Sequence, residues 1–596
     1  MGFFLKIIEM KKIIVVLLLL ITAFSYAQNE LLIKMSIKDQ IDQSEIVIKG
    51  EVIEKQSVWD DTKSMIYTIH KVKVYKQYKG ENNSFVHVIT KGGFVGNEGL
   101  KVYPNIYLSV SDFGIFIGNK ENIEIASYQN DLIYSPVGLN QGFFKIQEGD
   151  DEISNTTSTF ETLSKLEGEI ISHTGIEPLD IITSKVTQKK TSSINSSKNI
   201  VSGEITSYSP NEISAGNDAV LTITGNGFGN TNGEILFKDS NQGGLATVNA
   251  LNSAIVSWSD TEIKVKVPGD AGTGPFQVKP TAGGTFVQAG LIITHAYATV
   301  RTNSNVAEET EFYVHHVATD TNGTGLARNI NINGNYEFNF NTDFAANTEA
   351  KNTFASLFDD LVCNTGINFE LSTRSVGANT EASDNNNIVS FGSSSSNTAL
   401  ATCYQWFGGY GTFWFFSEMD IIVNETVTWN YSMSNETQST EYDFHNVLYH
   451  ELGHAAGMGH VVDGAKLMHY SVGRGEIPEE RTTGVHAPIN WKANHDATSS
   501  NPEQVDNIAL AACYSLSVDN LDESNLIVLY NVNDFSVSSS AIIKKIELYD
   551  ITGKKVYQKK INRYTTTLQR NLLGKGVFIA KFELEDNNFV IKKLLN

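Results

Sequence analysis

One stretch of this 596-residue chain carries most of the information about its fold and chemistry. It covers residues 443–460 and reads Asp443-Phe444-His445-Asn446-Val447-Leu448-Tyr449-His450-Glu451-Leu452-Gly453-His454-Ala455-Ala456-Gly457-Met458-Gly459-His460. Asp443 is a favourable helix N-cap, and no helix breaker follows it before Gly453. The stretch therefore predicts a helix that begins after Asp443 and carries the first histidines.

The spacing of the histidines predicts a metal site. His450 and His454 are four residues apart, so their imidazoles leave the same helical face one turn apart. Gly457 can adopt a positive φ, which would end the helix and bring His460 round as a third ligand. Three histidines leave one position of a tetrahedral zinc ion open, as in catalytic rather than structural sites. Glu451 is placed to act as general base on a water there.

The full string His-Glu-x-x-His-x-x-Gly-x-x-His, which begins at His450, resembles the signature of the metzincin zinc peptidases. The resemblance implies one catalytic zinc ion, an α+β catalytic domain, and peptide hydrolysis by zinc-activated water with Glu451 as general base. It also implies a methionine turn, for which Met468 is the candidate. Tyr470 matches a metal-proximal tyrosine of astacin-like and serralysin-like members, which would bind the resting zinc or stabilise the oxyanion. A plain packing role for Tyr470 is the alternative.

The subfamily and any further metal stay open. Asp420-Ile421 and Asn424 resemble matrixins, whereas the Met-His-Tyr turn resembles astacins, and Val461 replaces the serine that matrixins often carry after the third histidine. Asp320-Thr321-Asn322-Gly323 has the composition of a calcium loop, but an ordinary turn is the favoured interpretation. Calcium is therefore an unsupported addition to the single zinc ion.

The N-terminus predicts export. Two lysines precede an unbroken apolar run over residues 13–21, and Ser25-Tyr26-Ala27 offers a small-x-small cleavage site. Residues 1–27 are therefore expected to be a signal peptide, with Met10 as an alternative start. A membrane anchor is the alternative interpretation, but the run is shorter than the about 20 apolar residues that a span needs. No later segment is long and apolar enough for a stable membrane span.

The charge of the chain indicates which classes of molecule it is expected to bind. The formal net charge is −22 and no basic cluster stands out, which excludes nucleic acid as an expected partner because phosphate binding needs a positive stripe. A protein or peptide substrate is expected instead. The chain has only Cys363, Cys403 and Cys513, which allow one disulfide or simply lone buried thiols.

Two β-rich regions precede the metal motif. Residues 28–185 alternate apolar and polar side chains, as in Ile66, Thr68, His70, Val72 and Val74, and predict a barrel-like β domain with a helix near 159–170. This domain is either a propeptide or a binding domain, and nothing in it looks catalytic. Residues 186–200 have the composition of an exposed linker.

Residues 201–295 form the second β-rich region. Ile263, Val265 and Val267 alternate with charged residues before Pro268, and the strand at 221–224 runs into a glycine turn. With Ser209-Pro210 and the turn at 272–274, the segment resembles an immunoglobulin-like domain of the IPT/TIG family. The resemblance implies a β-sandwich that serves as spacer or binding module rather than as an active site.

Residues 296–516 are expected to form the metal-binding domain. A helical pattern covers 345–361, strands are expected at 367–371, 388–391 and 419–423, and 502–513 is a candidate closing helix. This mixture indicates an α/β or α+β domain.

Residues 517–596 return to strands and resemble the C-terminal sorting domain of the type IX secretion system of Bacteroidetes. We expect a β-sandwich with Ile546, Leu548, Val577 and Ile579 inside and a turn at Gly553. The resemblance implies the type IX secretion machinery as a partner and a secreted or surface-bound product.

Two functions follow from these patterns. The first is a secreted zinc endopeptidase. The second is a surface adhesin or binding protein in which the zinc domain supports or supplies recognition, and the intact Glu451 favours the first because a structural zinc site needs no base.

Overall fold

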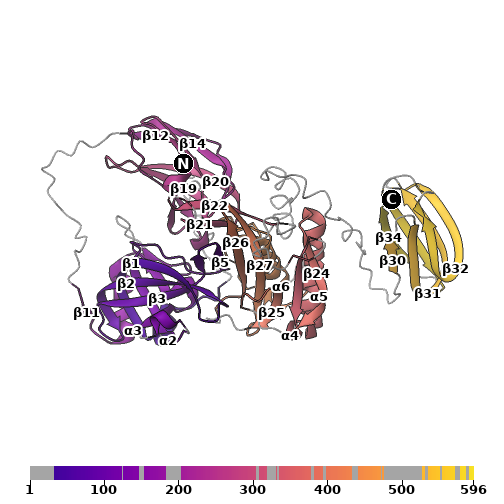
Figure 1. Ribbon diagram of the computed structural model, residues 1–596, viewed down its shortest axis with the longest axis horizontal. Coiled ribbons are helices and arrows are strands. Elements are labelled where there is room, and N and C mark those ends of the chain that lie inside the picture. The colour runs from indigo at the N-terminus through magenta and orange to yellow at the C-terminus, as the bar shows by residue number, and fades with distance from the viewer. Residues whose placement is uncertain are drawn as a thin grey trace, which may run out of the picture. The chain divides into compact units, whose positions relative to one another are not determined.

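Strands make up just over half of the residues that the structure describes, as the alternating patterns predict, and several separate sheets give a multidomain, mostly β protein (Figure 1). The computed structural model separates into two compact units, residues 1–358 with 367–502 and residues 359–366 with 503–596, and each is described by itself. The structure describes residues 32–123, 125–129, 131–146, 153–182, 203–303, 306, 308–317, 330–331, 334–377, 381–392, 398–432, 440–471, 473–474, 527–530, 534–550, 553–570, 573, 577–585 and 589–595.

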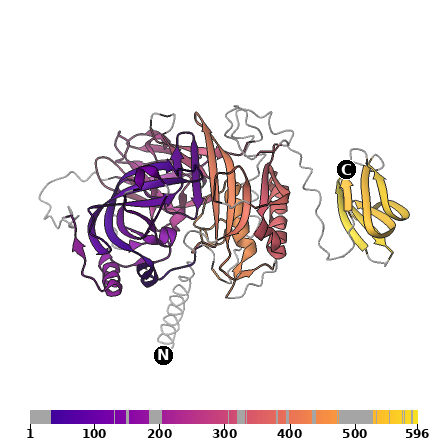
Figure 2. The same cartoon turned by 60° about the horizontal axis from the view of Figure 1, so that its bottom comes forward.

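The N-terminal domain is a ring of strands. β1 pairs with β2 and also with β6, so the sequence of pairs β1-β2-β3-β7-β6 returns to its start, in agreement with the expected barrel-like domain. Figure 2 shows these indigo strands curving round. The side chains predicted to share one face of β2 are buried, including His70 and Val72. The ring strands are β1 (Ile46–Trp59), β2 (Ile66–Lys79), β3 (Phe85–Lys91), β6 (Phe113–Lys120) and β7 (Ile133–Pro136).

Helices and short strands flank this ring. The expected helix near 159–170 is α3, which starts later because Thr162 caps it by accepting a hydrogen bond from the Lys165 N–H. Residues 159–160 are instead a short strand. The flanking elements are α2 (Ile37–Gln43), β8 (Phe143–Lys145), β9 (Ile153–Ser154), β10 (Thr159–Phe160), α3 (Leu163–Thr174) and β11 (Leu179–Asp180).

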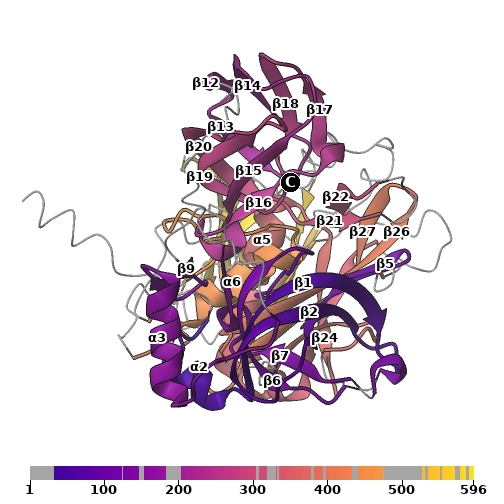
Figure 3. The ribbon, with the colours of Figure 1, turned by 90° about the vertical axis from the view of Figure 1, so that its left-hand side faces the viewer.

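The next domain is a sandwich of two sheets, ordered β12-β14-β18-β17 and β13-β20-β19-β15-β16 (Figure 3). Ile263, Val265 and Val267 are buried between them, as their alternation predicts. The strands are β12 (Glu204–Ser209), β13 (Glu212–Ala215), β14 (Val220–Asn226), β15 (Glu234–Asp239), β16 (Thr247–Asn249), β17 (Ile255–Trp258), β18 (Glu262–Lys266), β19 (Ala271–Lys279) and β20 (Phe286–Ala296).

The domain that carries the histidine motif is built on a mixed sheet. Its strands β24, β23, β25 and β27 are parallel, and β26 joins β27 in antiparallel orientation. The predicted helix at 345–361 and the three predicted strands are present, with shifted ends. The elements are β21 (Thr299–Thr302), β22 (Thr310–His315), β23 (Tyr336–Asn341), α4 (Thr342–Ala346), α5 (Thr348–Thr365), β24 (Phe369–Val376), β25 (Asn387–Gly392), β26 (Ala401–Tyr410), β27 (Phe413–Asn424), β28 (Trp429–Asn430), β29 (Tyr442–Asp443) and α6 (Phe444–Ala455).

The N-terminal domain extends this sheet with a hairpin of its own. Its strand β5 (Glu98–Tyr103) pairs antiparallel with β26 (Figure 1). The preceding strand β4 (Gly93–Val95) pairs antiparallel with β5. Behind the hairpin, an apolar cluster joins the two domains and includes Leu100, Val102, Tyr404 and Trp406. Trp59 stacks on Trp406 with ring centroids 5.7 Å apart. The contact buries large apolar side chains and therefore contributes substantially to stability.

The C-terminal unit is one sheet in the order β30-β31-β33-β34, with β32 on β31, and it encloses its own apolar core. The expected sandwich core is represented by apolar side chains of β31, β32, β33 and β34 that pack together. Ile546 and Leu548 are buried as predicted, and Gly553 has a positive φ of 82°. The prediction for Ile579 is wrong, because it is 37% exposed while its neighbours Phe578 and Ala580 point into the core. The strands are β30 (Ile527–Tyr530), β31 (Asp534–Asp550), β32 (Lys555–Gln569), β33 (Val577–Leu584) and β34 (Phe589–Leu595).

Several predicted features lie outside the described residues: the signal peptide, the linker at 186–200, the turn at 320–323, the candidate helix at 502–513 and Cys513, together with the Val577 side chain. Cys363 and Cys403 are not joined to each other by a disulfide. Among the helices of the described ranges, none combines the length and apolar character needed to cross a membrane.

Candidate metal centre

Helix α6 positions the first two histidines as the sequence predicts. Asp443 caps it by accepting a hydrogen bond from the Asn446 N–H at 2.8 Å, and the helix ends at Ala455. Gly457 then takes a φ of 86°, so the chain reverses and returns His460 to the helix. The loop geometry that glycine allows is therefore what completes the set of three histidines.

The three imidazoles converge. One ligand atom from each of His450, His454 and His460 lies within 4.8 Å of the others, and all three side chains are buried. The Nε2 atoms of His454 and His460 are 3.2 Å apart. Two nitrogens at the usual zinc distance and tetrahedral angle would be separated by about 3.3 Å. The histidines thus form a group that could hold one metal ion.

A second set of contacts turns every Nε2 atom toward the same point. The Nδ1 atom of His450 lies 2.8 Å from the Leu467 carbonyl oxygen, and that of His454 lies 2.9 Å from the Met458 carbonyl oxygen. The Nδ1 atom of His460 lies 2.9 Å from the Asn241 side-chain oxygen. Each acceptor fixes the proton on Nδ1 and leaves the Nε2 lone pair for a metal.

Unsatisfied buried atoms support the same interpretation. Within the described residues, His450 Nε2 and both Glu451 carboxylate oxygens are buried and lack a hydrogen-bond partner. Buried polar atoms are rarely left unpaired. Burial lowers the pKa of His450 to about 4 and those of His454 and His460 well below the usual range, so all three are neutral and able to bind a metal. Burial also raises the pKa of Glu451 well above its usual range.

Met468 and Tyr470, the two candidates that follow the motif, lie in different surroundings. Met468 is buried, and its carbonyl accepts a hydrogen bond from the Val461 N–H, in the loop whose Leu467 carbonyl orients His450. Tyr470 is also buried, and its hydroxyl end lies against Gly243 of the sandwich domain, where a Cβ atom would come within 2.3 Å of the hydroxyl oxygen.

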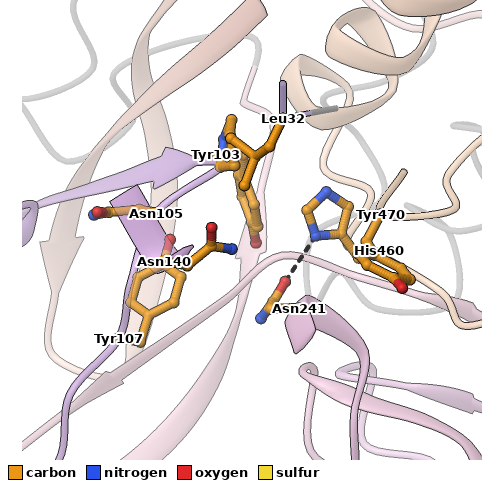
Figure 4. Close-up of a pocket in the computed structure, with 9 residues that line it drawn as sticks. Leu32, Tyr103, Asn105, Tyr107, Asn140, Asn241, His460 and Tyr470 are labelled. Carbon is orange, nitrogen blue, oxygen red and sulfur yellow. Dashed lines mark hydrogen bonds between the residues drawn. The ribbon is translucent and has the colours of Figure 1, made fainter. Parts of the chain in front are cut away.

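The N-terminal and sandwich domains close the site. The Tyr103 ring, at the end of β5, stacks on the His454 imidazole with centroids 4.1 Å apart and planes 5° from parallel. Leu32 forms a bridge with Ala399 close by. Beside His460 a cavity of about 10 Å³ remains, which is room for roughly one water molecule (Figure 4). It is lined by Leu32, Tyr103, Pro104, Asn105, Tyr107, Asn140, Asn241, His460 and Tyr470.

These contacts correct one expectation and bear on another. The sandwich domain was expected to be a spacer or binding module rather than part of an active site, yet Asn241 contacts His460. The N-terminal domain was expected to be either a propeptide or a binding domain, and its Tyr103 ring stacks on His454. No local sequence pattern marks Tyr103 or Asn241 as part of the site. Asn241, for example, is 219 positions from His460. Only the histidines, Glu451 and the loop after them could be found from spacing.

Two segments match known families. Residues 204–293 match the IPT/TIG domain, and residues 516–596 match a domain of unknown function (DUF8694). The matched families include no metzincin family. The chain is 33% identical over 116 residues to a cyclomaltodextrin glucanotransferase of Bacillus licheniformis and, to the same extent, to one of Bacillus sp. (strain 6.6.3). These alignments cover 20% of this chain and 13% of each relative.

We expect the purified full chain to contain close to one zinc ion per molecule. The three Nε2 atoms supply a preformed site, so elemental analysis after gel filtration should find near-stoichiometric zinc. His454→Ala should lose most of it, whereas His87→Ala, in the N-terminal domain, should retain it. Protein that is free of metal and cannot take up added zinc would contradict the assignment.

Proposed function

We propose that the protein is an exported zinc-dependent endopeptidase of the metzincin type, with an α+β catalytic domain at residues 296–516. The observation that carries the proposal is the convergence of His450, His454 and His460 next to Glu451, whose carboxylate oxygens have no partner in the described chain. A purely structural zinc site would not need an unpaired carboxylate beside it.

The residues have separate roles in this proposal. His450, His454 and His460 would hold zinc, which, when bound, lowers the pKa of water and stabilises negative charge on the substrate carbonyl oxygen. Glu451 accepts the proton of the attacking water and passes it to the leaving amine. The edge of β26 would align an extended peptide by strand pairing, since β5 already pairs there in the same manner.

The closed site supports a latent form of the enzyme. β5 occupies the strand edge, Tyr103 covers His454, and the remaining cavity is too small for a peptide. No cysteine occurs in residues 28–200, so none there could occupy the metal site as a ligand. The groups that cover the site are instead the Tyr103 ring and strand β5. The N-terminal domain would thus act as a propeptide that must leave before substrate can enter.

One observation favours the alternative, a surface adhesin or binding protein. The site lies where three domains meet, and a bound metal would tie them together through contacts from Tyr103 and Asn241. In that case zinc would support a rigid binding surface and no proteolysis would occur. Cleavage of a general protein substrate separates the two functions.

Export is the second part of the proposal. The N-terminal signal peptide would carry the chain across the inner membrane, and the C-terminal domain would act as the type IX sorting domain. The C-terminal unit has its own apolar core around β31 and β33, which suits recognition as a folded unit.

Deleting residues 517–596 is therefore expected to leave folded, zinc-binding protein in the periplasm, because the outer-membrane machinery would no longer recognise it. Ile546→Asp, which places a charge in the core, should have the same effect, whereas Val556→Asp, at a position 43% exposed, should be exported normally. Fractionation of the native host measures this. Normal export of the deleted form would indicate that the C-terminal domain is an adhesion module instead.

A further inference from the structure

Asn241 lies on a rigid loop of the IPT/TIG domain. The loop follows β15 as a short 3-10 turn, η3 (Ser240–Gln242), and the Asp239 carboxylate caps it by accepting a hydrogen bond from the Asn241 N–H at 2.9 Å. Ser240 is fully buried, and its N–H donates to the Asp270 carbonyl at 2.9 Å. The backbone of Asn241 is thus held on both sides, so its side chain projects from a fixed point.

The hydrogen bonds of Asn241 settle which way its amide faces. Its Nδ2 atom donates to an Asp270 carboxylate oxygen at 3.0 Å, and a carboxylate only accepts. The Oδ1 atom therefore faces His460 and accepts from its Nδ1–H at 2.9 Å. Asp270 is held in turn by Lys101 of β5 at 3.2 Å. The proton of His460 is placed on Nδ1 by this chain of contacts.

His460 differs from the other two histidines in this respect. His450 and His454 lie on a helix, and their Nδ1 acceptors are backbone carbonyls within 17 residues of them. His460 follows the helix in a loop, and its acceptor is a side chain of a different domain. The orientation of the third imidazole therefore depends on the docking of the IPT/TIG domain.

The IPT/TIG domain packs closely against the segment after His460, both at the Asn241 loop and beside it. Gly243 has a φ of 58°, and any Cβ atom there would come within 2.2 Å of the Tyr470 ring. A Cβ atom at Gly272 would come within 2.4 Å of Val462. The backbone of the IPT/TIG domain thus packs directly on the segment that follows His460, with no space for a side chain between them.

We propose that the IPT/TIG domain is an integral part of the metal centre and that Asn241 is its positioning residue, which orients His460 for metal binding. This inference rests on the proposed function only for the presence of a metal at the histidines, and not on peptidase activity. Hydrogen-bond partners of ligating histidines typically change metal affinity by about 10- to 100-fold when they are removed. An IPT/TIG domain in this role is more than a spacer.

The test compares two variants of the full chain with the unaltered protein. Asn241→Ala removes the acceptor and leaves space, whereas Asn241→Leu removes it and fills a similar volume, so agreement between them excludes a packing effect. Asn230→Ala, at an exposed position of the same domain, is the matched control. Zinc affinity is measured by competition with a chromophoric chelator, and the visible absorption spectrum of the cobalt(II)-substituted protein reports the ligand geometry.

Both Asn241 variants are expected to bind zinc about 10- to 100-fold more weakly and to shift the cobalt absorption bands, with the Asn230 control unchanged. Affinity and spectrum equal to those of the unaltered chain in either folded variant would overturn the inference. Failure of the unaltered chain to bind zinc would overturn both this inference and the proposed function. Tight zinc binding by a chain that cleaves no peptide even after its N-terminal domain has been removed would overturn the proposed function alone.

Discussion

Replacing Glu451 with alanine is expected to lower the rate of peptide cleavage by about 100- to 10,000-fold while zinc stays bound. Glu451 is fully buried beside the histidines, and its carboxylate is not part of the convergent ligand group. Removing it therefore takes away the group that moves protons without removing a metal ligand. The loss could exceed this range, since the same carboxylate would act in both proton transfers.

The measurement needs a structural control and a metal assay. Glu451→Gln keeps the shape of the side chain and should lose activity equally, and Glu425→Ala, at an exposed position of the same domain, should be fully active. Zinc content is determined on each variant. A Glu451 variant that cleaves peptides at nearly the unaltered rate would show that this carboxylate is not the base.

Removing the N-terminal domain should have the second large effect. A chain that begins near Val201 is expected to cleave peptides at least about 100-fold faster than the full chain, since only the fraction of molecules with an open site can react. In the full chain β5 fills the edge of β26 and Tyr103 covers His454. Steady-state cleavage of a fluorogenic peptide by the two proteins measures the difference.

The design must allow for the surface that truncation uncovers. Tyr404, Trp406 and Ile422 are almost fully buried against the N-terminal domain, so a chain made without that domain would expose an apolar face. A protease recognition sequence placed within residues 186–200 lets the full chain fold with this face covered, because the chain is cut only after folding. Equal activity before and after removal would exclude a propeptide and leave a binding domain.

The local part of the metal centre was predictable from sequence. Helix propensity, the cap at Asp443, the spacing of His450 and His454, and the positive φ of Gly457 are all properties of neighbouring residues. The alternation of Ile263, Val265 and Val267 likewise predicted a half-buried strand.

The remaining part depends on contacts that no local pattern records. Tyr103 meets His454, and Asn241 meets His460, only because three domains pack together. The strand β26 was missed because nine of its ten residues are buried, so it shows no alternation between apolar and polar side chains. Ile579 was assigned to the wrong face because a shift of one residue in a strand reverses which side chains point inward.

The most direct test of the central claim is cleavage of casein by the chain that has been cut within residues 186–200 and freed of its N-terminal domain, measured with and without a zinc chelator. The account predicts cleavage that the chelator abolishes and that added zinc restores, since His450, His454 and His460 would lose and regain the ion. Absence of cleavage by the cut, zinc-loaded protein, or cleavage that the chelator leaves unchanged, would contradict a zinc endopeptidase.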